Sequence, residues 1–193
     1  MPEPAPLAFS IAALNKATAS QAAAMIDRIV ERSAWLAHRA AAARPFGGGD
    51  DLAAWLEAEI HSLSRDKAVE FLCAHPELSP PDPATITAAS RREQQRLRLL
   101  DPDPDLADRL SDLNRRYVRR HGYPFVIALH AHKDIEDVLT QFEQRLGTDH
   151  DEELTRSLKE VVSVMRARLA RLIDLSTDAR DPAAPLTERG GVQ

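Results

Sequence analysis

Three short segments of the chain carry the residue types that bind and transform small molecules. The first, Phe71–Leu78, contains the imidazole of His75. The second, Ser90–Gln94, contains the carboxylate of Glu93, and the third, Gly122–Ile127, is short and mostly apolar. A proton-transferring ring, a carboxylate and an apolar stretch of backbone, taken from separate points of one fold, are typical of a small-molecule site.

The dipeptide His75-Pro76 predicts the end of a helix, because proline disfavours the helical conformation in the residue before it. The imidazole would then lie at a helix C-terminus, facing a stiff loop that contains Ser79–Pro83. Histidine has an ordinary pKa of about 6.5, so it can accept and release a proton near neutrality. The chain has seven histidines, and the alternative of an ordinary surface or core histidine stays open.

The segment Ser90–Gln94 has the spacing of a capping box, in which Ser90 accepts from a backbone N–H and Glu93 reaches back. In a second interpretation, the free N–H groups of the same helix start bind an anionic ligand beside Glu93 and Gln94. One helix start can serve both purposes.

Other candidate sites are weaker. His130 and His132 could be two ligands on one side of an extended segment, but no third metal ligand has a convincing spacing, so we expect no metal. Cys73 has no activating base in a nucleophile's arrangement and is expected to be buried. The arginines around residues 91–98 and 115–120 alternate with acidic residues, which indicates a solvated face. We find no cofactor motif and expect no cofactor.

Composition favours an all-α, single-domain helical bundle of a soluble protein. The chain has 193 residues, 44% of them hydrophobic but only 5% aromatic, and a net charge of -5. This acidic balance disfavours nucleic-acid binding. A single cysteine and the lack of a signal peptide or a long apolar run predict a cytoplasmic protein without membrane segments. We expect flexible tails at residues 1–9 and 176–193 and one helical domain at 10–175.

Apolar residues recur at helical spacing through most of the chain. We expect one long Ala-rich helix from Ser20 to Arg44, and a helix that starts after Asp101–Pro104. A left-handed C-cap is expected at Gly147. The one strand-like run lies near 124–129 and has no partner for a sheet, so it is interpreted as an extended segment that leads into a helix near Asp134.

The chain resembles the OHCU decarboxylases, the 2-oxo-4-hydroxy-4-carboxy-5-ureidoimidazoline decarboxylases that complete the conversion of urate to (S)-allantoin. The similarity runs from about Ala12 to Asp174, and it depends on the order and spacing of several motifs rather than on any one of them. The motifs are Leu14-Asn15, the run from Glu31 to Phe46, Ala74–Leu78, Leu113-Asn114 with Tyr117, Gly122–Ile127, Phe142–Leu146 and Arg166–Leu169.

The resemblance implies an all-α domain, often homodimeric, and a cofactor-independent decarboxylation of a small ureidoimidazoline. It implies that His75 is the catalytic histidine, that Pro76 lines the pocket and that Glu93 is the second acid-base residue. It also implies two substrate-binding segments, with the residues Ser90, Arg91, Arg92, Glu93 and Gln94 in one and Phe125, Val126, Ile127, Ala128, Leu129 and His130 in the other.

Two departures from the family pattern leave alternatives open. Ser79-Pro80 stands where relatives usually have Ala-Gly, and His130 stands where many have an arginine, whose forked donors a histidine cannot reproduce. Either His130 substitutes as a cation, Lys133 or an arginine compensates, or the chain acts on a different ureido or hydroxy-acid substrate. A non-catalytic helical interaction module on the same scaffold is a further alternative.

Overall fold

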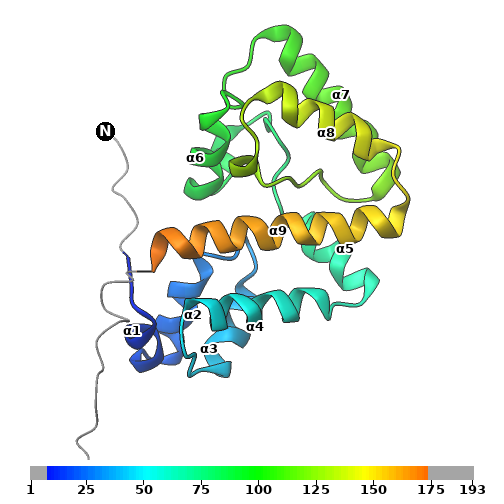
Figure 1. The fold of residues 1–193 in the computed structure, drawn as a ribbon. Coiled ribbons are helices and arrows are strands. Elements are labelled where there is room, and N and C mark those ends of the chain that lie inside the picture. The colour runs from blue at the N-terminus through cyan, green and yellow to red at the C-terminus, as the bar shows by residue number, and fades with distance from the viewer. Residues whose placement is uncertain (1–7, 174–193) are drawn as a thin grey trace, which may run out of the picture.

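The long helix α9, His150–Leu172, runs through the middle of the molecule and separates two groups of helices (Figure 1). The computed structural model describes residues 8–173, which are helical throughout apart from connecting segments and one isolated bridge. On one side of α9 lie α1 (Ile11–Lys16), α2 (Ala19–Asp27), α3 (Ala34–Ala43) and α4 (Gly49–His61). On the other lie α6 (Ala88–Arg96), α7 (Pro104–His121) and α8 (Ile135–Leu146), while α5 (Arg65–Cys73) packs against α9.

Apolar side chains explain the central place of α9. Leu158, Val162 and Leu169 are among its buried residues, and the face they share belongs to one hydrophobic core with members from Phe9 to Ile173. Asp149 caps the helix by accepting from the backbone N–H groups of Asp151 and Glu152. The all-α prediction is therefore confirmed. Among the described residues, none of the helices combines the length and the apolar character of a membrane span.

The expected single Ala-rich helix is wrong. The structure has two helices, α2 and α3, which pack against each other and are separated by residues 28–33. Arg32 adopts a left-handed conformation with φ of 46° in this break, and the Ser33 hydroxyl donates to the carbonyl oxygen of Glu31 at 2.8 Å. High helix propensity is overridden here because a turn allows both helices to bury their apolar faces against each other.

The predicted helix starts are confirmed for two helices. Asp103 caps α7 with Pro104 in its first turn, and Asp134 caps α8. The left-handed cap at Gly147 is wrong, because Gly147 has φ of -89°. The left-handed glycine is Gly122, which has φ of 85° and ends α7 by donating its N–H to Val118. Cys73 was expected to be buried, but it is exposed and its thiol lies 3.4 Å from the Gly122 carbonyl oxygen.

The extended segment is observed as residues 124–128, and it continues into the short 3-10 helix η2, Leu129–Ala131. A second 3-10 helix, η1 (Pro83–Thr85), precedes α6. The predicted domain boundaries stay predictions, because residues 1–7 and 174–193 lie outside the described part. Phe9, placed in the expected tail, is buried and its N–H donates to the carbonyl oxygen of Leu172 at 2.8 Å.

A buried ionic cluster lies behind the extended segment. Arg145 of α8 and Glu153 of α9 are both fully buried, and the Arg145 Nε donates to Glu153 at 2.8 Å. Tyr117 of α7 also donates its hydroxyl to Glu153. Because breaking a buried pair leaves an uncompensated charge, this cluster holds the three helices in one arrangement.

Candidate active site

His75 lies two residues after the last residue of α5, and its ring is held in a defined tautomer. Its Nδ1 lies 3.0 Å from the carbonyl oxygen of Phe71. A carbonyl can only accept, so Nδ1 carries the proton and donates it. Nε2 is then an acceptor, and it is buried without a hydrogen-bond partner among the described residues. Burial lowers the pKa of His75, which keeps the ring neutral near pH 7.

The helix α6 supplies the carboxylate of Glu93, but it begins three residues earlier than predicted. Thr87 is its N-cap and accepts from the backbone N–H of Ser90. The capping box at Ser90 is therefore wrong, and Ser90 lies within the helix. Ser90 and Glu93 are three residues apart, so they share one face of the helix.

Gln94 braces the loop that follows His75 and Pro76. It accepts from the Ser79 N–H at 2.8 Å and donates to the Glu77 carbonyl oxygen at 3.0 Å. Ser79 adopts φ of 51°. The loop with Ser79-Pro80, which departs from the family pattern, is therefore held by hydrogen bonds between its backbone and the Gln94 side chain.

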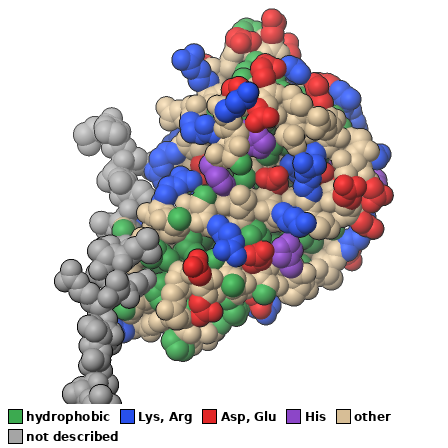
Figure 2. Space-filling view, in the orientation of Figure 1, with side chains coloured by type: hydrophobic (Ala, Val, Ile, Leu, Met, Phe, Trp, Pro, Cys, Tyr) green, Lys and Arg blue, Asp and Glu red, His purple; other side chains and the backbone are tan. Residues whose placement is uncertain are grey.

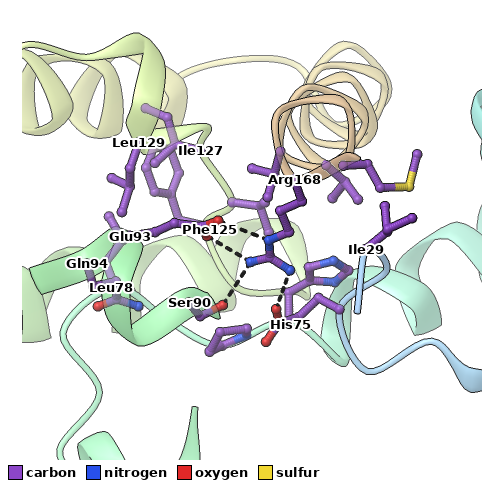
Figure 3. Close-up of a pocket in the computed structure, with 16 residues that line it drawn as sticks. Ile29, His75, Leu78, Ser90, Glu93, Gln94, Phe125, Ile127, Leu129 and Arg168 are labelled. Atoms are coloured by element: carbon purple, nitrogen blue, oxygen red, sulfur yellow. Dashed lines mark hydrogen bonds and ion pairs between the residues drawn. The ribbon is translucent and has the colours of Figure 1, made fainter. Parts of the chain in front are cut away.

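Arg168 of α9 joins three parts of the chain in this region. Its Nε and Nη2 donate to the two carboxylate oxygens of Glu93 at 2.9 and 2.7 Å, and Nη1 donates to Glu31 at 2.7 Å. Nη2 also lies 3.2 Å from the Ser90 hydroxyl. Figure 3 shows these bonds converging on the guanidinium beside His75. Only 7% of the Arg168 side chain is exposed, so water screens these charges weakly.

Glu31 lies in the break between α2 and α3. Burial raises its pKa, but the charge of Arg168 and hydrogen bonds from Arg168, Thr87 and Ser90 more than offset this, and the pKa lies below its usual value. The Thr87 hydroxyl is 2.8 and 3.0 Å from the two carboxylate oxygens. Glu31 is therefore ionised at neutral pH.

The extended segment forms the apolar wall. The ring of Phe125 stacks on Phe142 with centroids 3.8 Å apart. The guanidinium carbon of Arg145 lies over the Phe125 ring, 4.4 Å from its centroid. The N–H of Ala128 donates to Glu160 of α9 at 2.9 Å. Together with the buried ionic cluster, these contacts fix the segment relative to α9.

These parts line a cavity of about 60 Å³. A cavity of this size holds a few water molecules or part of a compact ligand, so the site suits a small molecule rather than a polymer. Its walls combine a neutral imidazole, two ion-paired carboxylates, a guanidinium and apolar side chains. Such a set can bind an anionic group of a ligand and transfer protons to and from the adjacent atoms of that ligand. Within residues 8–173, no three His, Cys, Asp or Glu side chains are arranged to share a metal ion.

Comparison with known proteins identifies the family. The model of the OHCU decarboxylase family matches residues 15–170. The chain belongs to the OHCU decarboxylase family.

Two relatives named 2-oxo-4-hydroxy-4-carboxy-5-ureidoimidazoline decarboxylase illustrate the similarity. The protein from Haloferax volcanii is 31% identical over 142 residues, which cover 74% of this chain and 83% of the relative. The protein from Mus musculus is 34% identical over 151 residues, which cover 77% and 84%. A crystal structure of (S)-allantoin synthase has a TM-score of 0.65 and 23% identity over 86% of this chain, which spans 55% of that longer structure. That structure supports the fold.

The structure brings the three sequence segments of this OHCU decarboxylase family member together. Nine of the predicted site residues line the cavity, and they are His75, Pro76, Ser90, Glu93, Gln94, Phe125, Val126, Ile127 and Leu129. Four others do not line it. Ala128 is buried and faces Glu160, whereas Arg91, Arg92 and His130 are exposed. The Nε2 of His130 lies 3.4 Å from the Ser163 hydroxyl.

Two residues of the site, Glu31 and Arg168, were not assigned a role from the sequence. Arg168 belongs to the same buried face of α9 as Met165 and Leu172, so a charged residue next to these apolar positions was the available signal. Glu31 is likewise a charged residue next to buried apolar residues, because it directly follows Ile29 and Val30. A charge at a buried position needs a partner, but the sequence does not say where the partner lies.

Proposed function

We propose that this protein catalyses the cofactor-independent decarboxylation of 2-oxo-4-hydroxy-4-carboxy-5-ureidoimidazoline to (S)-allantoin, a step in urate degradation. Membership of the OHCU decarboxylase family gives the reaction. The observation that carries the proposal for the site is the buried, unpartnered Nε2 of His75, which lies in the same cavity as Arg168 and Glu93.

The substrate supplies its own electron sink. Loss of CO₂ from C4 leaves an electron pair that can be delocalised into the adjacent C5=N bond of the ring. The protein has to bind the carboxylate, orient the ring and move protons. Orientation and acid-base catalysis are the two contributions that such a site can make, and the second gives about 10² to 10⁴ in rate.

We assign the binding of the substrate carboxylate to Arg168, which is the cation lining the cavity among the described residues. Its planar fork of donors matches a carboxylate in a bidentate geometry. This assignment favours one of the alternatives raised by His130, namely that an arginine elsewhere in the chain compensates. Lys133 is a weaker candidate because 82% of its side chain is exposed and it lies near Asp134.

His75 acts as the base toward the C4 hydroxyl, because its neutral Nε2 is free to accept a proton. Glu93 is the second acid-base residue. Ser90 and Gln94 position α6 and the loop, and the wall from Phe125 to Leu129 holds the ring so that the proton reaches one face of C5. The (S) configuration of the product follows from this fixed orientation.

We further propose that the enzyme acts in the cytoplasm as a homodimer and binds no nucleic acid. The single cysteine and the net charge of -5 support the first and last points, and the family resemblance supports the dimer. Light scattering of the purified protein measures the oligomeric state directly.

The experiment that tests the reaction mixes the purified protein with the freshly generated product of urate oxidation and hydrolysis. Circular dichroism then follows the formation of (S)-allantoin. We expect faster formation and an optical excess relative to a sample with heat-denatured protein. An unaccelerated, racemic product would overturn the proposal and favour a different ureido substrate or an interaction module.

A further inference from the structure

Glu31 is a buried carboxylate that the proposed chemistry does not use. It lies on the side of the Arg168 guanidinium away from Glu93, held by Nη1 of Arg168 and by the Thr87 hydroxyl. Only 5% of its side chain is exposed, compared with 16% for Glu93. Glu31 is therefore the more firmly held of the two acidic partners of Arg168, and Glu93 is the more accessible one.

The charges of this pocket do not balance. Arg168 contributes one positive charge and Glu31 and Glu93 contribute two negative charges, while His75 is neutral. The extended segment from Phe125 to Leu129 adds no charged side chain, and neither do the other residues of α9 that line the cavity, Val161, Val164 and Met165. The pocket therefore has a net charge of about -1 before any ligand binds.

Other charged groups lie nearby but on the solvent side. Glu31, Glu93 and Arg168 also line a wider groove on the surface, whose further charged residues are Asp27, Arg28, Arg32, Arg92 and Arg171. Most of these are exposed, and Glu77 of the loop after Pro76 is partly exposed. Water and salt screen their effect on the buried cluster.

A substrate with a carboxylate would bring the charge around Arg168 to about -2, which is disfavoured because Arg168 and Glu31 are buried and Glu93 is largely shielded from water. We propose that Glu31 sets the charge of the pocket so that the substrate's carboxylate binds together with one proton, and that this is the proton which the reaction consumes. The inference rests on the proposed function and extends it to a residue whose role was unassigned.

The geometry indicates where the proton goes. The Nε and Nη2 edge of Arg168, which would bind a carboxylate bidentately, is occupied by Glu93. When the substrate's carboxylate takes this edge, Glu93 loses both donors, while Nη1 stays on Glu31. A carboxylate that is largely shielded from water, loses both donors and faces another anion favours its protonated form. Glu93 thereby changes from an ion-pair partner into an acid.

The proton balance of the reaction agrees with this. The C4–carboxylate bond breaks, CO₂ leaves, and the electron pair moves through C5=N onto the ring nitrogen, which takes the proton from Glu93. His75 then removes the proton of the C4 hydroxyl as C4=O forms, and returns it to C5. The sum is one substrate anion and one proton giving neutral allantoin and CO₂.

The test measures kcat and KM for decarboxylation from about pH 6.5 to pH 8.5 in the wild type, in Glu31→Gln and in Glu57→Gln. Because one proton binds with the substrate, wild-type kcat/KM should fall roughly tenfold per pH unit, through a rise in KM at constant kcat. Glu31→Gln keeps the shape of the side chain but removes one negative charge, so the substrate should bind without the proton. Its KM should then change less than about twofold per unit, and the pH dependence should appear in kcat.

Glu57→Gln is the matched control. Glu57 of α4 pairs with Arg166, which belongs to α9 as Arg168 does, but this pair lies on the exposed surface. Its pH profile should follow the wild type. The inhibition constant of (S)-allantoin, which has no carboxylate, should stay flat with pH in all three proteins. This last readout separates a charge effect from a general distortion of the pocket.

The outcomes are distinguishable. A wild type that fails to decarboxylate overturns the proposed function. An active wild type whose kcat/KM is flat with pH overturns the present inference alone, whether or not Glu31→Gln folds. A folded Glu31→Gln enzyme whose KM rises with pH as steeply as that of the wild type also overturns it, because Glu31 would then not set the charge.

Discussion

At the scale of single residues, the site depends on which atoms have partners and which do not. The Nδ1 of His75 is satisfied by Phe71, whereas Nε2 is buried without a partner. An unmet hydrogen-bonding group in a cavity costs stability, and it is retained where a ligand supplies the partner. The imidazole is thus prepared as an acceptor before the substrate arrives.

Replacing His75 with Asn removes this acceptor. We expect turnover to fall by about 10² to 10⁴ while the helical circular dichroism spectrum stays unchanged. His130→Asn is the control, because His130 is exposed and does not line the cavity, and its kcat should stay within about twofold of the wild type. A folded, active His75→Asn enzyme would remove His75 from the mechanism.

Glu31 should also make the folded state sensitive to acid. Its pKa is lowered in the folded state, so its contribution to stability is fully present above the unfolded value near 4.5 and is lost as the pH falls through the folded value. We expect Glu31→Gln to lower the free energy of unfolding by about 1–3 kcal/mol at pH 7. The difference from the wild type should shrink in urea titrations below about pH 4. A difference that is the same at both pH values would contradict this.

Sequence reasoning named His75 and Glu93 as candidates because both belong to local motifs, and both line the cavity. It assigned no role to Arg168 or Glu31, because their pairing is set by the fold: Arg168 is 137 residues from Glu31 and 75 residues from Glu93. The same limit explains Ser90, whose local spacing matched a capping box although Thr87 caps the helix. Local patterns name the residue types, whereas the partners are decided by packing.

At the scale of elements, the extended segment depends on how α7 ends. Gly122 adopts φ of 85°, and the chain then turns into Tyr123 and the apolar wall of the site. The sequence suggested a left-handed glycine at the end of α8 because Gly147 follows an apolar stripe. Gly147 instead continues in the right-handed region, since its N–H bonds to the last turn of α8.

The two glycines provide a matched pair of substitutions. Gly122→Ala should lower the free energy of unfolding by about 1–2 kcal/mol, because a side chain disfavours positive φ. No atom lies within 4 Å of the added Cβ, so the cost is conformational rather than steric. Gly147→Ala should be neutral or slightly stabilising, because φ there suits any residue. Urea denaturation measures both, and equal effects would argue against the assigned conformations.

At the scale of the whole molecule, the cavity lies where the two groups of helices meet. Glu31 comes from the α2–α3 side, Glu93 and the extended segment come from the α6–α8 side, and Arg168 comes from α9 between them (Figures 1 and 3). Figure 2 shows charged side chains of both signs scattered over one face of the molecule. Among the described residues, the large hydrophobic side chain that is exposed is Trp35.

This arrangement predicts that both sides unfold together. The two tryptophans, Trp35 in α3 and Trp55 in α4, report on one side, whereas far-ultraviolet circular dichroism reports on all helices. Because α9 and one continuous core join the sides, both signals should give the same urea midpoint. Since (S)-allantoin would contact both sides, a concentration about ten times its Kd should shift both midpoints together, adding about 1.4 kcal/mol. Separate transitions, or a shift in the dichroism signal alone, would show that the ligand does not bind at the junction of the two sides.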